Sequence, residues 1–456
     1  MRLVVAVVLL ALGCAGAHAQ RSLSLDEALV LAKRQNPDIV VARKQLEAAR
    51  GGVTEARAGF LPSVISTGLL RKRTEQEQSR LRDDDYNASV RVVQNVYTAG
   101  ATKARVAIAR LFEEKRALEL AAVTDRVAMD LRSAYYELLF NSAQIGVREE
   151  AVTVMRDELK AQQERFAAGT VGELNVRRAE VSLGNEQPEL FDAQTRLQNS
   201  YLRVEELCGV ATDPKSPGFA TSGRLQYRPH HPELQECLAR AAAFRPEVKA
   251  RQIDVEIEEQ QLIIDQSELR PRVEIFGGYE AYSERDPAVG PEFNHGYVVG
   301  LNASWHIFDG FATRGRMQAT RARRDAAAAA FEAAQRSVAS EVRSAFLDLE
   351  QADRVLASET RNVQNANDSL ELARGNLAAG LGTQLDLLQA TADFTRTRTT
   401  RLNAIYLHNV ARARLARATA REPEELGFGQ PAATAETAKS QAQAFDLARP
   451  PANLSE

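Results

Sequence analysis

Two hydrophobic periodicities alternate along the chain of 456 residues. Over long stretches such as 101–166, which contains no proline, apolar residues recur every three, four or seven positions, as they do in amphipathic helices. Between these stretches the pattern becomes a strict alternation, in which Val273, Ile275 and Tyr279 face one way and residues such as Glu274 the other. Alternation over about ten residues is typical of a β-strand with two different faces. The pattern predicts a mainly α chain with a small β part.

The same order of segments occurs twice. Leu61-Pro62 lies 209 residues before Arg270-Pro271. From Val96-Tyr97, which matches Ile307-Phe308, the offset becomes 211 residues and stays constant over the rest of the repeat. A fixed offset over such a length indicates a tandem duplication, with one register slip between positions 62 and 96.

Each repeat is expected to contain a leading helix, a strand hairpin, a long helix and a return helix. The first repeat spans 20–212, with these elements over 24–58, 60–97, 101–168 and 173–210. The second repeat spans 233–421, with the same elements over 233–268, 271–308, 312–379 and 384–421. A linker, 213–232, joins the repeats, and 422–456, rich in Ala, Gln and Pro, is expected to be a disordered tail.

The N-terminus, 1–19, is typical of a secretory signal peptide. Arg2 precedes an apolar run, and Ala17-His18-Ala19 supplies the small-x-small pattern, so cleavage is expected after Ala19. Cys14 is an alternative site, at which a lipoprotein-type cleavage would attach a lipid. Both alternatives predict export from the cytoplasm.

Composition narrows the possible functions. The formal net charge is -3, which argues against a nucleic-acid binder because such a protein needs a basic surplus. Beyond the N-terminus no run approaches the roughly 18 apolar residues of a spanning helix, although strands of a membrane barrel barely register in bulk hydropathy. His-Glu-x-x-His, Gly-rich phosphate loops and Gly-x-Ser-x-Gly elbows are lacking, so we expect neither enzymatic activity nor a cofactor. His230-His231 is interpreted as a solvated pair in the linker rather than a metal site.

Two cysteines, Cys208 and Cys237, flank the linker. In an oxidising compartment they could form a disulfide, and the alternative is a pair of buried free thiols. We favour the free thiols.

The strand hairpins predict an oligomer. Two hairpins give four strands, and an open four-stranded sheet leaves unpaired backbone groups that lipid cannot satisfy. Bacterial barrels begin at about eight strands, so three chains with twelve strands make the economical closed ring. The more polar strand faces indicate a water-filled lumen, with these candidate lining residues: Arg91, Arg272, Glu274, Glu280 and Asn302. A coiled-coil stalk or adhesin without a pore is the alternative, but it leaves both hairpins unexplained.

Several short motifs, in duplicated order, resemble the TolC-like outer-membrane efflux proteins. They are Leu25–Leu29 with Asn36-Pro37, the echo at Arg245-Pro246, Leu61-Pro62, Tyr97–Gly100, Phe308–Gly310 and two glycine turns. The resemblance implies a homotrimer with a twelve-stranded β-barrel in the outer membrane of a Gram-negative bacterium and a long periplasmic α-barrel. It also implies a periplasmic membrane-fusion adaptor and an inner-membrane pump of RND, ABC or MFS type as partners in efflux or type I secretion.

The resemblance places a closable periplasmic entrance at the glycine turns. The residues concerned are Gly169, Thr170, Gly172 and Asn175 in the first repeat, and Gly380, Gly382, Asp386 and Gln389 in the second. Asp386 matches a position where family members carry an aspartate ring, whereas Gly382 replaces a frequent arginine, which implies a different lock. Three copies of Asp386 would favour cations at the mouth. The alternative is an ordinary helix-start aspartate, favourable near the positive end of the helix dipole.

Overall fold

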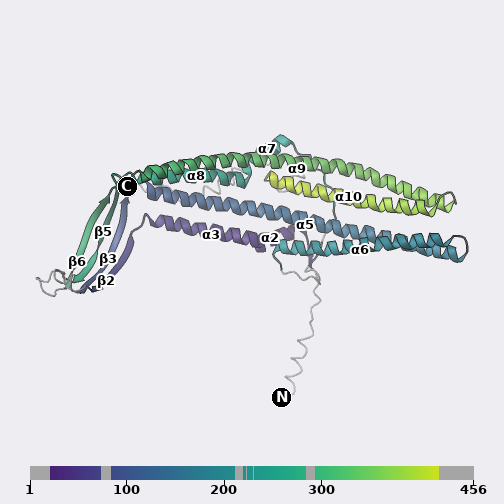
Figure 1. Ribbon diagram of the computed structural model, residues 1–456, viewed down its shortest axis with the longest axis horizontal. Coiled ribbons are helices and arrows are strands. Elements are labelled where there is room, and N and C mark those ends of the chain that lie inside the picture. The colour runs from purple at the N-terminus through teal and green to yellow at the C-terminus, as the bar shows by residue number, and fades with distance from the viewer. Residues whose placement is uncertain are drawn as a thin grey trace, which may run out of the picture.

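The computed structural model describes residues 21–72, 84–210, 219–221, 223–229, 231–283 and 293–420. The signal peptide 1–19, Cys14, His230 and the tail 422–456 lie outside the described residues. The molecule is a long rod of helices with a β-sheet at one end and, at the other, the two turns that connect pairs of helices (Figure 1). The predicted fold class, mainly α with a small β part built on a four-stranded sheet, is confirmed. Within the described part, no helix combines the length and apolar composition needed to cross a bilayer.

The helices of the two repeats correspond one to one. The first repeat contains α2 (Leu25–Gln35), α3 (Pro37–Ala58), α5 (Ala101–Ala167) and α6 (Glu173–Cys208). The second contains α7 (Leu234–Phe244), α8 (Pro246–Ser267), α9 (Ala312–Ala378) and α10 (Gln384–Ala418). Helices α5 and α9 have 67 residues each. At about 1.5 Å per residue each runs roughly 100 Å, the length of the rod.

The predicted single leading helices over 24–58 and 233–268 are wrong, because each is broken into two. The breaks fall at Asn36 (φ -58, ψ 128) and Arg245 (φ -63, ψ 120), the residues before Pro37 and Pro246. A proline ring clashes with the preceding residue in the α conformation and moves it to extended backbone. The same prolines then begin α3 and α8, where a missing N–H costs nothing.

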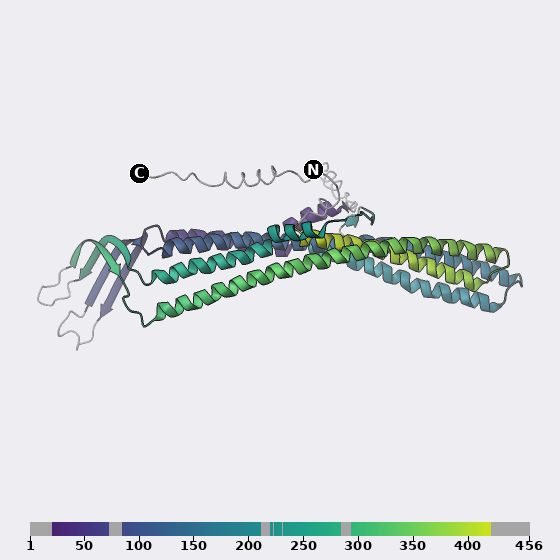
Figure 2. The same cartoon turned by 90° about the horizontal axis from the view of Figure 1, so that it is seen from above.

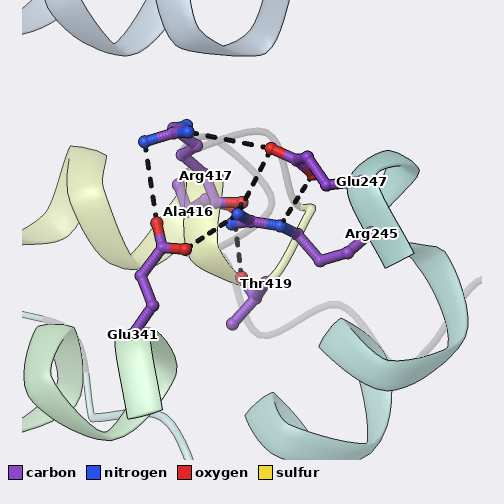
Figure 3. A network of polar contacts seen from close by, with 6 residues as sticks. All are labelled: Arg245, Glu247, Glu341, Ala416, Arg417 and Thr419. Atoms are coloured by element: carbon purple, nitrogen blue, oxygen red, sulfur yellow. Dashed lines mark hydrogen bonds and ion pairs between the residues drawn. The ribbon is translucent and has the colours of Figure 1, made fainter. Parts of the chain in front are cut away.

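Both breaks are attached to the end of a return helix. Asn36 Nδ2 donates a hydrogen bond to the Leu207 carbonyl at 2.8 Å, and its repeat equivalent, Arg245, donates from Nη1 to the Arg417 carbonyl at 3.0 Å. Arg245 also contacts Glu247 at 3.1 Å and Glu341 at 2.8 Å, as Figure 3 shows. Arg417 lies 3.7 and 3.6 Å from the same two carboxylates and completes the network. Each repeat therefore closes on itself at mid-rod.

The hydrophobic core is also concentrated at mid-rod and is duplicated. Leu131, Leu138 and Val204 are buried in the first repeat. Their equivalents 211 residues later, Val342, Leu349 and Leu415, are buried in the second. Two clusters of the same construction thus hold the leading, long and return helices of each repeat together.

The two cysteines lie in different clusters. Cys208 belongs to the first and Cys237 to the second, and both are free thiols, so the disulfide alternative is excluded in this structure. Burial, with a smaller contribution from Glu205, raises the pKa of Cys208 to about 11. A thiol that stays protonated at neutral pH is a poor nucleophile, as expected of a core residue.

The strands form one antiparallel sheet that joins the repeats. Its order is β2 (Ser63–Lys72), β3 (Asp84–Tyr97), β5 (Arg272–Ser283) and β6 (Phe293–Ser304). The β3–β5 pair is the seam between the repeats, with a register shift between Asn95 and Tyr97. A second sheet, not predicted, pairs β1 (Arg21–Leu23) in parallel with β4 (Phe219–Thr221), which lies in the predicted linker. Both hairpins leave the helices at the same end of the rod (Figure 2).

Candidate functional site

The five candidate lumen residues all lie on one face of the sheet. Glu274 is paired with Asn302 across β5 and β6, and Arg91 on β3 is paired with Gly278 on β5, two residues from Glu280. Arg272 and Glu280 follow on the same face because side chains alternate along a strand. Asn302 Nδ2 donates to Glu274 Oε1 at 2.9 Å, and Arg91 forms an ion pair with Glu280. The structure therefore brings these residues together as one polar surface that crosses the seam.

An aromatic ring interrupts this polar face, which sequence reasoning missed. Phe276 lies between Glu274 and Gly278 and packs over Gly300, where an added Cβ would lie 2.5 Å from the ring. The Arg91 guanidinium is 5.9 Å from the centre of the same ring, within the range of a cation–π contact. Phe276 belongs to the alternating pattern of the sequence, but only the cross-strand register shows that a glycine, Gly300, makes room for it.

The opposite face of the sheet is apolar and exposed. Tyr297 is 89% exposed, Val299 86% and Leu301 65%. Tyr279 on the neighbouring strand packs edge-on against Tyr297, with ring centres 5.3 Å apart. Large exposed apolar surfaces mark contact with a protein or membrane. A sheet with one polar and one apolar face can separate water from lipid.

The two glycine turns at the far end of the rod have the same backbone geometry. Gly169 (φ 73) and Gly380 (φ 72) adopt the left-handed conformation that ends a helix. The next N–H groups, of Thr170 and Leu381, donate to the carbonyls of Arg165 and Asn376 at 2.9 and 2.8 Å. This pattern is a Schellman motif in both repeats. Thus the duplication extends to the individual hydrogen bonds of the tip.

The helices that leave the two turns start differently. Thr383 and Asp386 form a capping box at α10, in which Thr383 donates to Asp386 Oδ2 at 2.7 Å and Asp386 N–H donates to Thr383 Oγ1 at 3.2 Å. Hydrogen bonds from Thr383 lower the pKa of Asp386, so its carboxylate is charged at neutral pH. The equivalent residues, Gly172 and Asn175, provide no side-chain cap for α6. Asp386 therefore has the helix-start role that sequence reasoning gave as the alternative.

The other predicted tip residues have local partners. Gln389 donates to both carboxylate oxygens of Asp393 at 3.1 Å. At Gly382 an added Cβ would lie 3.1 Å from Asn376 Cβ, so a larger residue would crowd the turn. Neither contact reaches across to the first repeat.

Two contacts that were not predicted connect the tips of the repeats. Gln384 Nε2 donates to the Asn175 carbonyl at 3.2 Å, next to the turns. Further up, Arg398 on α10 forms an ion pair with Glu150 on α5 at 2.5 Å. Nothing in the local sequence pattern around Arg398 reveals a partner 248 positions away.

His231, the remaining histidine candidate, lies near a carboxylate of α9. His231 Nδ1 is 3.9 Å from Asp353 Oδ2. Among the described residues no three His, Cys, Asp or Glu side chains gather as a metal site requires.

Comparison with known proteins finds relatives of this architecture. The family described as outer membrane efflux protein matches residues 28–210 and 237–421, which covers both repeats. Protein CyaE of Bordetella pertussis is 25% identical over 381 residues, covering 82% of this chain and 79% of CyaE. Outer membrane protein TolC of Vibrio cholerae is 23% identical over 384 residues, covering 81% of this chain and 84% of TolC.

The fold recurs in a solved structure. The Campylobacter jejuni CmeC outer membrane channel superimposes with a TM-score of 0.74 at 15% identity, over 92% of this chain and 89% of CmeC. At this identity the similarity establishes the fold, and the assignment of a family rests on the sequence match over both repeats.

Proposed function

Because the chain belongs to the outer membrane efflux protein family, we propose that it is the outer-membrane channel subunit of a tripartite efflux or type I secretion system. The observation that carries this proposal is the sheet with one polar and one exposed apolar face, joined at one end to helices of 67 residues. The sheet fits an outer membrane, and the rod is long enough to reach far into the periplasm. Members of this family are channels, and we propose a non-enzymatic role.

We further propose a homotrimer. The outer strands β2 and β6 each have one unpaired edge in the single chain. Lipid cannot satisfy these backbone groups, so β6 of one copy must pair with β2 of the next. Three copies then close a ring of twelve strands around the polar face, with Arg91, Glu280 and Glu274 toward the lumen. The helical layer has α9 at one edge and α3 and α6 at the other, which lets the same ring continue into the periplasm.

We propose that the glycine turns form the periplasmic entrance, where a membrane-fusion adaptor and an inner-membrane pump of RND, ABC or MFS type would deliver the exported substrate. The turns lie at the end of the rod opposite the sheet (Figure 1). The contacts Gln384–Asn175 and Arg398–Glu150 hold the two helix pairs of one chain, α5–α6 and α9–α10, together at this end. They supply the lock that the frequent arginine, replaced here by Gly382, cannot.

Membrane fractionation and planar-bilayer recording test the channel itself. We expect the full chain in the outer-membrane fraction, as a heat-resistant trimer that conducts ions after reconstitution. A soluble monomer without conductance would contradict the channel and support the stalk or adhesin alternative.

The charge of Asp386 is expected to control ion passage at the entrance. In Asp386→Asn, loss of three carboxylates from the mouth of the trimer should raise or reshape the conductance. It should also weaken block by divalent cations, because the ring no longer concentrates them. Single-channel recording with and without added divalent cations measures both effects. Asp393→Asn removes an exposed carboxylate from the same helix and serves as the control. Equal conductance and equal block in wild type and Asp386→Asn would refute the filter role and leave Asp386 only its role in capping α10.

A further inference from the structure

A strap of seven residues, 223–229, lies between the two repeats and against α9 and α10. Leu225 packs on the cluster formed by Leu356, Ala404 and Ile405. Tyr227 donates from its hydroxyl to Asp353 Oδ1 at 3.1 Å, and its ring meets His408 edge-on at 4.7 Å. These contacts direct the apolar side chains of the strap toward the second repeat.

The backbone of the strap is held by two buried side chains of α10. Asn409 Nδ2 donates to the Gln226 carbonyl at 3.0 Å, and His408 Nε2 lies 3.0 Å from the Arg228 carbonyl. Asp353 lies 2.9 Å from the other ring nitrogen of His408. Anchors at three successive residues, 226–228, fix the backbone of the strap as a wall, from which the exposed side chains of Arg224 and Arg228 extend.

Behind this wall lies a cavity of about 390 Å³, which we call the strap cavity. Four of its lining residues are arginines: Arg132 from α5, Arg224 and Arg228 from the strap, and Arg412 from α10. Among the described residues of the lining, Asp26 is the one acidic side chain. Arg132 and Arg412 each interact with a further group, whereas Arg224 and Arg228 are exposed. Arg132 and Arg412 are only 8% and 6% exposed.

We propose that the strap cavity binds a small organic anion that carries phosphate or carboxylate groups. A guanidinium presents a planar fork of donors that matches two oxygens of such a group, and a site of four arginines repels cations. The volume falls in the range of small-ligand sites. Tyr136 and Leu139 add apolar surface to the lining, which suits an organic anion better than a bare inorganic one.

The duplication provides an internal comparison. The equivalents of Arg132, Tyr135 and Tyr136 in the second repeat are Arg343, Phe346 and Leu347. Arg343 is exposed, and Leu347 is 59% exposed. The same helix position thus forms a buried basic lining only where the strap covers it, and Arg343 is a matched control.

Isothermal titration calorimetry on the purified full chain in detergent tests the site. The probes are citrate for carboxylates and pyrophosphate for phosphates, each at constant ionic strength. We expect saturable binding of at least one probe with one site per chain. In Arg224→Gln/Arg228→Gln, affinity should fall about tenfold per guanidinium removed. Arg343→Gln should bind as wild type does.

The outcomes separate the alternatives. Citrate alone or pyrophosphate alone defines the chemical class of the ligand. Arg224→Lys/Arg228→Lys keeps the charge but loses the fork, and weaker binding by this variant would support recognition by guanidinium groups. No saturable binding of either probe, or equal affinity in wild type and Arg224→Gln/Arg228→Gln, would overturn the proposal. Thermal unfolding of each variant confirms that a loss of binding is not a loss of folding.

Discussion

Gly209→Ala is expected to destabilise the first repeat by several kcal/mol. Gly209 ends α6 in the left-handed conformation (φ 72), and an added Cβ would lie 2.5 Å from the Gln35 carbonyl oxygen. The conformation costs an alanine about 1–2 kcal/mol and the overlap about 1–3 kcal/mol more, because both partners are backbone and the structure has to move. The measurement is the thermal unfolding of the purified protein, together with its level in the outer membrane.

The second repeat supplies the control for this substitution. The residue equivalent to Gly209 is Ala420, which adopts φ 51. An alanine is therefore tolerated in the left-handed region at the same place in the fold, and the close approach to Gln35 distinguishes the two sites. Ala420→Gly should leave stability unchanged or raise it slightly. If Gly209→Ala unfolds at the wild-type temperature, the Gln35 carbonyl of α2 lies farther from Gly209 than the 2.5 Å contact requires.

Arg245→Ala is expected to cost about 3 kcal/mol, the lower end of the range for breaking a buried ion pair. The Arg245 side chain is 4% exposed and contacts Glu247, Glu341 and the Arg417 carbonyl. Its removal takes one donor from that carbonyl, which still accepts from the Ala420 N–H at 3.1 Å. The two carboxylates are 36% and 39% exposed and keep Arg417 nearby, which limits the loss. Thermal unfolding and proteolysis at mid-rod report the change.

Arg251→Ala is the matched control, because it removes an arginine side chain from α8, the helix that Arg245 directly precedes. Its side chain is 56% exposed and lies 3.4 Å from Asp254, so its loss should cost less than about 1 kcal/mol. Equal effects of the two substitutions would show that the network around Arg245 contributes no more than a surface pair.

Sequence reasoning predicted those features that depend on local periodicity or on the duplication. The long helix expected over 101–168 is observed as Ala101–Ala167, since its pattern runs without proline or other interruption. The break at Asn36 could have been predicted as well, because the rule for residues before proline applies there. The leading helices were treated as single because their apolar pattern continues across the break.

Features that depend on distant partners could not be predicted. Alternation along β3 and β5 assigns residues to a face, but the Arg91–Glu280 pair depends on the register of strands 189 positions apart. The strap 223–229 has no periodicity, and Asn409, which holds it, is 183 residues from Gln226. At the tip, sequence reasoning identified Asp386, but Gln384–Asn175 is a contact to a backbone carbonyl, for which no residue pattern exists.

The seam between β3 and β5 has a consequence for how such a ring originates and assembles. Within one chain, the second strand of repeat one pairs with the first strand of repeat two. In the proposed trimer, β6 meets β2 of the next copy in the same relation. The ring then consists of six similar repeats, and every second seam between repeats lies within one chain. A homohexamer of single repeats would have the same outline. Fusion of two repeats into one chain makes half of the seams intramolecular, which raises the effective concentration of the two repeats for each other. Assembly of the ring then needs three chains to meet instead of six. It also frees the two halves to diverge, as the capped and uncapped turns and the strap have done.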